Sequence, residues 1–295
     1  MTIYLNGEWL AIEKATISVL DRGFIFGDGV YEVIPVYSRR PFRLKEHLQR
    51  LQHSLDGIRL SNPHSTAEWI SLIDSLIDKN TGEDQYLYLH ITRGAARRDH
   101  PFPNPPVPPT VFVMSSPLPL PSADLIKNGT SAMTAQDNRW MHCDIKAISL
   151  LPNVLLRQIA VDAGCAETIL LRAESVSAAF DPATAFLTEG AASNIFVIKN
   201  GVLLAPPKDH LMLPGITYDV ILEIASRHDI PHQVRKIAAS ELFHADELLL
   251  SSSTREVQAI TRLDGRSVGS GVPGAMFLQI NQYYQEFKQN VMRAL

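Results

Sequence analysis

The stretch Leu20-Asp-Arg-Gly-Phe-Ile-Phe-Gly-Asp-Gly-Val-Tyr-Glu-Val33 decides the fold together with three stretches that follow it along the chain. Its glycines Gly27 and Gly29 are typical of turns, because glycine accepts backbone conformations that other residues avoid. The other stretches are Cys143-Asp-Ile-Lys146, Thr188-Glu-Gly190 with Ser193-Asn194, and Leu213-Pro-Gly-Ile-Thr217. Each is weak evidence by itself, so the pattern of the surrounding chain matters.

The chain is long enough for more than one domain. It has 295 residues, of which 45% are hydrophobic and 20% charged, and this is enough apolar material for a sizeable core. The stretch Pro117-Leu-Pro-Leu-Pro121 has the composition of a stiff linker. We therefore expect two domains, residues 1–120 and residues 121–295.

Charge and cysteine content exclude several classes of protein. The net charge is −4 and the basic residues are scattered, so nucleic acid is not an expected partner. The first residues lack a basic region followed by an apolar run, and no apolar stretch is long enough to span a bilayer. Cys143 and Cys165 are too few for a disulfide framework or a cysteine zinc site, and we expect both to be buried thiols. The sequence predicts a soluble, cytoplasmic protein without a metal site.

Two hairpins are predicted at Asn-Gly dipeptides, which accept the positive φ angles of a type I′ turn. They join Ile3–Leu5 to Glu8–Leu10 and Ile195–Ile198 to Val202–Leu204. Leucines recur at helical spacing between Arg43 and Leu55, with Arg50 beside the apolar face.

The remaining patterns mix helices with strands. We expect strands at Tyr86–Thr92, Thr110–Ser115, Thr168–Leu171 and Leu248–Leu250, and helices at Leu155–Ala163, after Gly215–Thr217 and at Ala275–Gln289. Arg97, Arg98, His100 and six prolines between Pro101 and Pro109 predict an ordered loop. The mixture indicates an α/β or α+β chain.

Lys146 precedes an apolar segment. Burial of a lysine in such surroundings disfavours its ammonium form and frees the amine for Schiff-base chemistry. The local sequence alone favours the alternative, in which the stem packs and the charged head reaches water.

Three segments offer the parts of a phosphate site, which needs backbone N–H groups at a helix N-terminus, hydroxyl donors and preferably an arginine. They are Gly215-Ile216-Thr217, the hydroxyl cluster Ser251–Thr254, and Arg50. Runs of serine and threonine more often cap or turn the chain. Glu189, read alone, also suits a surface turn.

In combination, the four stretches occur in the order found in fold-type IV aminotransferases, and the chain resembles this family over essentially its whole length. The family includes D-amino-acid, branched-chain and R-selective amine aminotransferases and aminodeoxychorismate lyase. The resemblance implies a small N-terminal α/β domain, a larger C-terminal pseudo-barrel α/β domain that binds the cofactor, and a homodimer with pyridoxal 5′-phosphate (PLP) between the domains.

Position by position, the resemblance makes Lys146 the Schiff-base lysine, which carries the proton between substrate Cα and cofactor C4′. Glu189 corresponds to the partner of the pyridinium nitrogen, whose protonation lets the ring accept electrons. The phosphate-binding residues implied in the same way are Arg50, Ile216, Thr217, Ser252 and Ser253.

The resemblance is greatest to D-amino-acid (D-alanine) aminotransferases. In these, a tyrosine matching Tyr31 and an Arg-x-His pair matching Arg98 and His100 bind the substrate α-carboxylate, the pair coming from the neighbouring subunit. An arginine fork is a chemically suitable clamp for a carboxylate, although Arg97, Arg98 and Asp99 could also form a solvated charge cluster. Thr254 is expected to border the substrate.

Two features depart from the family pattern. Ala191-Ala192 stand where members often have serines, so a hydroxyl near the cofactor is expected to be missing. Ala173–Phe186 lengthens the connection between a strand and the Thr-Glu-Gly motif, which predicts a longer hairpin tip or flap.

The predicted activity is PLP-dependent transamination between a D-amino acid, of the D-alanine or D-glutamate type, and a 2-oxo acid such as pyruvate or 2-oxoglutarate, by ping-pong half-reactions. The alternatives in the family are an aminotransferase for L-branched-chain amino acids or R-amines, or a lyase. A catalytically silent PLP-binding protein is a further alternative, but binding alone does not require both Lys146 and Glu189.

Overall fold

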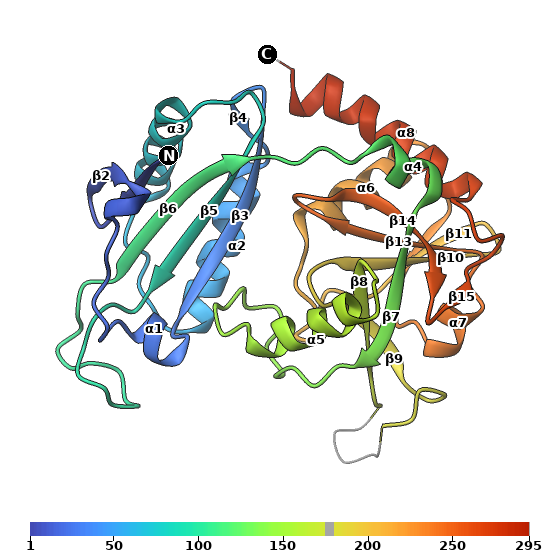
Figure 1. The fold of residues 1–295 in the computed structure, drawn as a ribbon, viewed down its shortest axis with the longest axis horizontal. Helices are drawn as coiled ribbons and strands as arrows, with labels where there is room; N and C mark the ends of the chain where they lie inside the picture. Colours follow the sequence, from blue (N-terminus) through green and yellow to red (C-terminus); the bar gives the residue numbers. More distant parts are fainter. Residues whose placement is uncertain (175–179, 295) are drawn as a thin grey trace. The chain divides into compact units, whose positions relative to one another are not determined.

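A computed structural model describes residues 1–174 and 180–294 of the chain (Figure 1). These residues form two compact units, each with its own sheet. The first unit comprises Met1–Leu118 and Ile145–Leu150, and the second comprises Pro119–Asp144 and Leu151–Leu295. Lys146 therefore belongs to the first unit, although it follows the proline-rich stretch in the sequence.

The first unit is built on a six-stranded sheet in the order β2-β1-β6-β5-β3-β4, and all its neighbouring strands are antiparallel. Its elements are β1 (Thr2–Leu5), β2 (Glu8–Ala11), a 3₁₀ turn (Ile12–Lys14), α1 (Arg22–Phe26), β3 (Gly29–Tyr37), β4 (Arg40–Pro41), α2 (Leu44–Gly57), α3 (Thr66–Lys79), β5 (Gln85–Thr92) and β6 (Thr110–Pro117).

The two faces of this sheet differ in character. Along β5, buried Leu87, Leu89 and Ile91 alternate with half-buried Tyr88 and His90, as expected for a strand with one face in the core. The buried face packs in one apolar cluster with α2 and α3 (Figure 1). The opposite face carries aromatic and polar side chains, which lie outside the apolar core.

The second unit is built on a curled nine-stranded sheet in the order β12-β11-β10-β13-β14-β7-β8-β9, with β15 paired to β14. The pairs β14–β7, β7–β8 and β11–β12 are parallel, and the others are antiparallel. The strands are β7 (Thr130–Gln136), β8 (Glu167–Arg172), β9 (Phe186–Gly190), β10 (Asn194–Lys199), β11 (Val202–Ala205), β12 (His232–Val234), β13 (Glu247–Ser252), β14 (Glu256–Leu263) and β15 (Arg266–Ser267).

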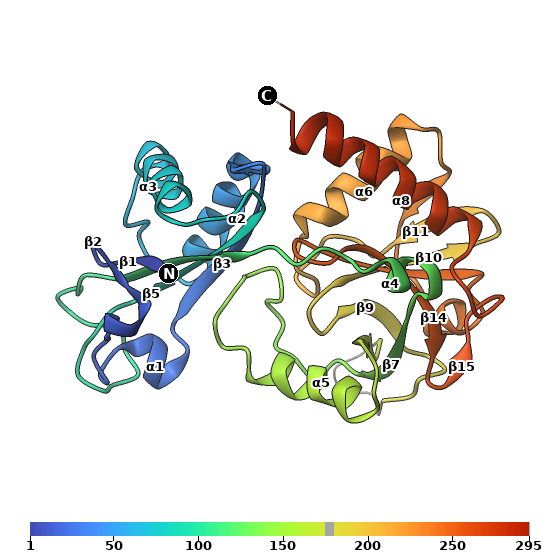
Figure 2. The same cartoon turned by 45° about the horizontal axis from the view of Figure 1, so that its top comes forward.

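Helices cover this second sheet. The helices α6 (Ile216–Arg227) and α8 (Ala275–Phe287) lie side by side (Figure 2), and Tyr218 of α6 stacks on Phe196 of β10 with ring centroids 5.1 Å apart. A π-helical turn (Lys288–Met292) continues α8, and the other helices are α4 (Ala123–Asn128), α5 (Leu151–Asp162) and α7 (Ala239–Phe243). Helix α5 packs on the sheet through Leu156, and Ala160 is buried as well, while the other side of the helix is exposed.

The predicted hairpins, the predicted loop before Thr110 and the α/β class are confirmed. The helix expected at Leu155–Ala163 begins earlier, at Leu151, because Pro152 fits the first turn of a helix. The patterns did not indicate several elements, among them α3, β3, β7 and β14. Cys143 is buried, whereas Cys165 is only half-buried, so the expectation of two buried thiols is half wrong. The expected flap falls partly on residues 175–179, outside the described residues.

Candidate active site

Lys146 and Tyr31 lie together in the first unit. The Lys146 ammonium nitrogen is 4.2 Å from the centre of the Tyr31 ring, in the geometry of a cation–π contact. Tyr31 is on the aromatic face of the sheet, where its ring centroid is 5.7 Å from that of Tyr88. The Tyr88 hydroxyl is hydrogen-bonded to His90 Nδ1 at 2.8 Å. Lys146 is therefore half-buried against a polar aromatic surface.

Backbone contacts hold the lysine segment against β3. The Tyr31 N–H donates to the Lys146 carbonyl at 2.9 Å, and the Lys146 N–H donates to the buried Ser54 hydroxyl at 3.0 Å. A Cβ atom at Gly29 would lie 2.4 Å from the carbonyl oxygen of Ile91 and 2.9 Å from the Ile148 side chain. Glycine is thus required for this close approach.

Arg50 lies under the same unit in a buried ion-pair cluster. Its Nε and Nη2 donate to the two oxygens of Glu32 at 2.8 Å each, and His47 Nδ1 contacts Glu32 at 2.9 Å. Although burial opposes it, Arg50 holds the pKa of Glu32 far below its usual range. Burial lowers the pKa of His47. The predicted phosphate fork therefore already binds a carboxylate in this structure, a partner that the sequence analysis missed.

Arg98 and His100 are exposed and lie against one ring. The Arg98 guanidinium is 5.4 Å from the centre of the Phe26 ring, and the His100 ring centroid is 5.5 Å from it. Within the described residues, Arg98 makes no contact with an acidic side chain. The two predicted clamp residues are therefore both exposed and both contact Phe26, the last residue of α1.

Glu189 is buried in the second unit and is contacted by Arg139. The Arg139 Nη1 donates to Glu189 Oε1 at 2.6 Å, while its Nε and Nη2 donate to both oxygens of Asp137 at 2.9 Å. Asp137 also contacts Arg172 at 3.1 Å and accepts from the Thr188 hydroxyl at 2.8 Å. Glu189 is therefore no surface turn residue but the end of a buried charge network.

In this network the pKa of the Glu189 carboxyl group lies near neutral pH. Burial raises its pKa to about 7, against the opposing charge of Arg139. Burial also acts on Asp137, but Arg139 and Arg172 lower the pKa of that carboxyl to about 2. The pKa of the Cys143 thiol rises to about 12 through burial, so it stays neutral. A cation near Glu189 would keep this carboxylate ionised.

Asn194 connects Glu189 to the start of α6. Its side-chain amide donates to Glu189 Oε2 at 3.3 Å and to the Leu213 carbonyl at 3.0 Å, and the Leu213 N–H donates to Glu189 at 3.2 Å. A Cβ atom at Gly215 would lie 1.9 Å from Asn194 Oδ1. Asn194 thus requires glycine ahead of Ile216, the first residue of α6.

The start of α6 has the properties of an anion site. Gly215 precedes the helix, and no side chain caps it, so the N–H groups of Ile216 and Thr217 are available. Asn194 pairs with Ser251 across β10 and β13. The Ser251 hydroxyl is buried and has no hydrogen-bond partner among the described residues. Ser252, Ser253 and Thr254 follow it and are half-buried.

The segment Ala191-Ala192-Ser193, where the sequence departs from the family pattern, is largely buried. Ala191 is buried, and the Ser193 hydroxyl donates to Glu167 Oε2 at 2.8 Å. Arg255 contacts the same oxygen at 3.1 Å. Ser193 is therefore bound to another strand.

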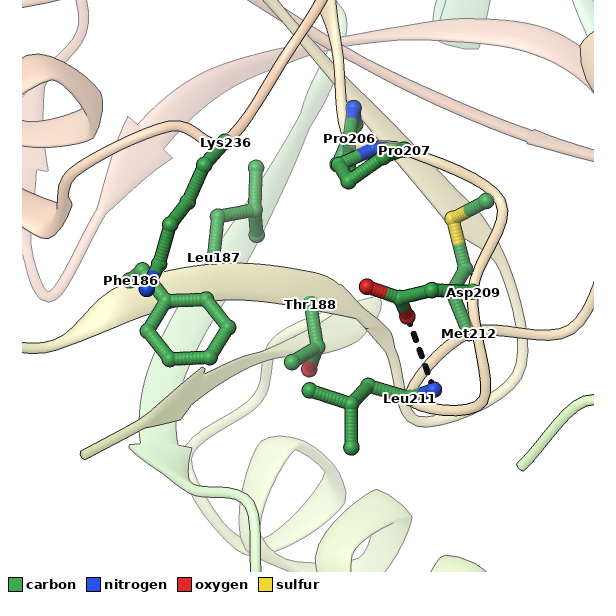
Figure 3. A pocket seen from close by; sticks show the side chains of 9 residues that line it. All are labelled: Phe186, Leu187, Thr188, Pro206, Pro207, Asp209, Leu211, Met212 and Lys236. Carbon is green, nitrogen blue, oxygen red and sulfur yellow. Dashed lines mark hydrogen bonds between the residues drawn. The ribbon is translucent and has the colours of Figure 1, made fainter. Parts of the chain in front are cut away.

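A small cavity of about 150 Å³ lies at β9 (Figure 3). Its lining includes Thr188, Asp209 and Lys236 together with apolar side chains, and Asp209 accepts a hydrogen bond from the Leu211 N–H. No predicted site residue lines it.

Sequence reasoning missed Arg139, Asp137 and Glu32. Arg139 and Asp137 stand in none of the quoted motifs, and Glu32 stands in the stretch from Leu20 to Val33 without a role. Asn194 did stand in a quoted motif, but without a role. Arg139 and Glu189 are 50 residues apart, and Arg50 and Glu32 are 18 apart, so only the fold reveals these contacts.

Comparison with known proteins identifies the family. The family model "Amino-transferase class IV" matches residues 29–263. The chain belongs to the class IV aminotransferases. The family, the fold class, the enzyme class and the PLP cofactor predicted from the sequence are thereby confirmed.

Similar proteins cover nearly the full chain. A "D-alanine aminotransferase" of Staphylococcus epidermidis is 38% identical over 288 residues, 98% of each chain. One of Bacillus licheniformis is 37% identical over 276 residues, 94% of this chain and 93% of the relative.

Similar solved structures include branched-chain amino acid aminotransferases. The enzyme from Escherichia coli has a TM-score of 0.81 at 28% identity and covers 95% of this chain and 92% of its own. Another such enzyme, solved with pyridoxamine 5′-phosphate, has a TM-score of 0.87 at 27% identity, covering 97% and 93%.

The residues present fit PLP. The uncapped start of α6 and the buried Ser251 hydroxyl without a partner among the described residues suit a phosphate group. Glu189, with its pKa near 7, suits a protonated ring nitrogen.

The described residues contain no helix that is long and apolar enough to cross a membrane.

Proposed function

We propose that this enzyme exchanges the amino group between a D-amino acid, of the D-alanine or D-glutamate type, and a 2-oxo acid such as pyruvate or 2-oxoglutarate. The observation that carries this proposal is the pairing of Arg98 and His100 on Phe26, without an acidic partner for Arg98 among the described residues. The full-length relatives named D-alanine aminotransferase support it.

Lys146 moves the proton at the substrate Cα. Bound PLP supplies a ring that accepts the electrons released at this carbon. Lys146 would hold the cofactor through its side-chain amine, and as a free amine it would accept the proton from the substrate Cα. The Tyr31 ring, 4.2 Å from the lysine nitrogen, stabilises the ammonium that forms.

Glu189 keeps a proton on the ring nitrogen of the cofactor. Arg139 and the Leu213 N–H orient its carboxylate. Because the group is buried, its charge acts strongly on a neighbouring cation. Asn194 and Arg139 therefore serve as positioning residues for Glu189.

Ile216 and Thr217 would hold the phosphate of PLP through their N–H groups, and Thr217, Ser252 and Ser253 would hold it through their hydroxyls. Arg50 adds positive charge, while Glu32 fixes the direction of its guanidinium.

Tyr31, Arg98 and His100 bind the substrate carboxylate, and Thr254 borders the substrate. An exposed arginine with no acidic partner among the described residues keeps its donors free for such an anion.

The enzyme acts as a homodimer, in which Arg98 and His100 serve the site of the partner subunit. The exposed side of α5 supports a dimer, because Leu151, Val154, Leu155 and Ile159 form an apolar stripe that is 41–68% exposed. Apolar stripes of this kind mark protein interfaces. We place the enzyme in the cytoplasm, where its two free cysteines stay reduced. We also propose that residues 1–120 form the small domain and that residues 121–295 form the cofactor-binding domain.

Transfer from L-branched-chain amino acids is the second candidate, favoured by the TM-score of 0.87 to a branched-chain aminotransferase. The test uses the yellow holoenzyme without a 2-oxo acid. D-Alanine should bleach the visible band of the bound cofactor much faster than L-alanine or L-leucine. Faster bleaching by L-leucine would overturn the D-specific proposal and leave the family assignment unaffected.

A further inference from the structure

Asp28 stands at the centre of the Gly-Asp-Gly segment and has no part in the function described so far. Its Oδ2 accepts hydrogen bonds from Nε of Arg22 and from Nε of Arg93, each at 2.8 Å. Both arginine side chains are less than 10% exposed. Burial tends to raise the pKa of Asp28, but Arg93 and Arg22 lower it below its usual value. One ionised carboxylate thus orients two buried guanidinium groups.

Arg22 binds the backbone of the loop that carries Arg98 and His100. Its Nη1 donates to the carbonyls of Asp99 at 2.6 Å and Pro101 at 3.2 Å, and its Nη2 donates to the carbonyl of His100 at 3.2 Å. Three successive residues of the loop are therefore held by one side chain. The planar donors of arginine allow this, whereas a lysine ammonium offers a single centre.

Arg93 holds the next part of the loop. Its guanidinium lies 3.7 Å from the centre of the Phe102 ring, and its Nη1 and Nη2 donate to the carbonyls of Arg59 and Ile58 at 3.2 and 2.7 Å. The loop from residue 97 to residue 109 has no helix or strand. Side-chain contacts such as these must fix its conformation.

The same cluster reaches the two exposed side chains. Phe26, which Arg98 and His100 contact, also lies 4.8 Å from the Arg22 guanidinium. Asp28 is three residues from Tyr31 along the chain and begins the turn into β3. The segment that presents Tyr31 therefore also determines where Arg98 and His100 lie.

We propose that Arg22, Asp28 and Arg93 are positioning residues that hold the loop of Arg98 and His100 in the geometry that binds the substrate carboxylate. This inference rests on the proposed function of that loop. It assigns a role to the Asp-Arg-Gly and Gly-Asp-Gly parts of the stretch from Leu20 to Val33.

The test compares Arg22→Lys with Arg39→Lys in the holoenzyme. Arg39 is the matched control, because it also donates to backbone carbonyls, of Ile77, Asn80 and Gly82, and contacts Asp78. Two substrates are used, D-alanine and D-alaninol, which differ in the carboxylate. Arg22→Lys should lower kcat/KM for D-alanine by about ten- to a hundredfold, as displacement of a binding group does, and leave that for D-alaninol nearly unchanged.

Hydrogen exchange followed by mass spectrometry provides a readout that does not depend on activity. Peptides covering residues 95–104 should exchange faster in Arg22→Lys than in the wild type, and equally in Arg39→Lys. Asp28→Asn, which keeps the size of the side chain, should reproduce both effects if Arg22→Lys does not fold. Unchanged exchange in these variants overturns the inference, whatever the enzyme acts on.

Faster exchange with unaltered kinetics for D-alanine also overturns it, and Arg98→Ala then locates the error. If Arg98→Ala weakens the use of D-alanine, the clamp stands and only the positioning role is wrong. If Arg98→Ala has no effect, the proposed function of the loop is wrong. An equal loss for D-alanine and D-alaninol contradicts a role directed at the carboxylate.

Discussion

Glu189→Gln should change how the stability of the cofactor-free protein depends on pH. Burial raises the pKa of Glu189 from an ordinary 4.5 to about 7. The folded chain therefore binds this proton more tightly than the unfolded chain does. The Glu189 contribution to the free energy of unfolding is fully present below about pH 4.5 and is lost as the pH rises to about 7.

The size of the effect follows from the two pKa values. One pKa unit corresponds to 1.36 kcal/mol, so the wild type should lose about 3 kcal/mol relative to Glu189→Gln across this range. The carboxyl group is buried, and solvent does not screen it. Asp137 does not interfere, because Arg139 and Arg172 outweigh its burial and hold its pKa at about 2.

The assay is urea unfolding of the cofactor-free wild type and variant at several pH values from 4.5 to 8. The difference between the two proteins is the relevant quantity, because titration of the other groups cancels in it. Arg139→Met should move the pH range upward, since it removes the cation that opposes burial. A difference that stays constant within about 0.5 kcal/mol would refute the reasoning. It would mean that Arg139 keeps Glu189 ionised throughout.

The remaining predictions concern the lysine, the dimer and the shared site. Lys146→Ala should abolish turnover, and borohydride should no longer attach the cofactor to the chain, as mass spectrometry can show. Ile159→Glu should weaken the dimer by at least about a hundredfold, because the charge would be desolvated in the interface. Gln158→Glu, at the neighbouring exposed position, should not weaken it. Light scattering measures both variants, and an unchanged dimer of Ile159→Glu would contradict an interface at α5. Mixing Lys146→Ala with Arg98→Ala chains under subunit exchange should restore about a quarter of the sites for D-alanine. No recovery, with subunit exchange verified independently, would mean that Arg98 serves the site of its own chain or no site.

Local sequence patterns predicted those parts of the fold that depend on neighbours in the chain. The Asn-Gly hairpins and the leucine spacing of α2 are examples, and both match the structure. Helix α3 also had a local signal, the capping box of Ser65 and Glu68, which was overlooked. Strand β7 has no such signal, since its pairing with β8 and β14 determines it.

In the candidate site, too, local sequence predicted some features, whereas contacts between distant residues determined others. The order of the motifs and the family resemblance predicted Lys146, Glu189 and the start of α6 as parts of one site. The electrostatic state of Glu189 was beyond reach, since its partner Arg139 is 50 residues away in the sequence. The sequence also suggested a free Arg50, whereas the fold places its guanidinium on buried Glu32.

The sequence by itself therefore determined the family and the cofactor and predicted the residue types of the chemistry, because short motifs in a fixed order carry this information. The tertiary structure decided which charges meet. Arg22 reaches a loop 77 residues away, and Asp28 joins it to Arg93 across 65 residues. The physical reason is that a hydrogen bond depends on distances of about 3 Å between atoms, and only the packing of distant segments sets such distances.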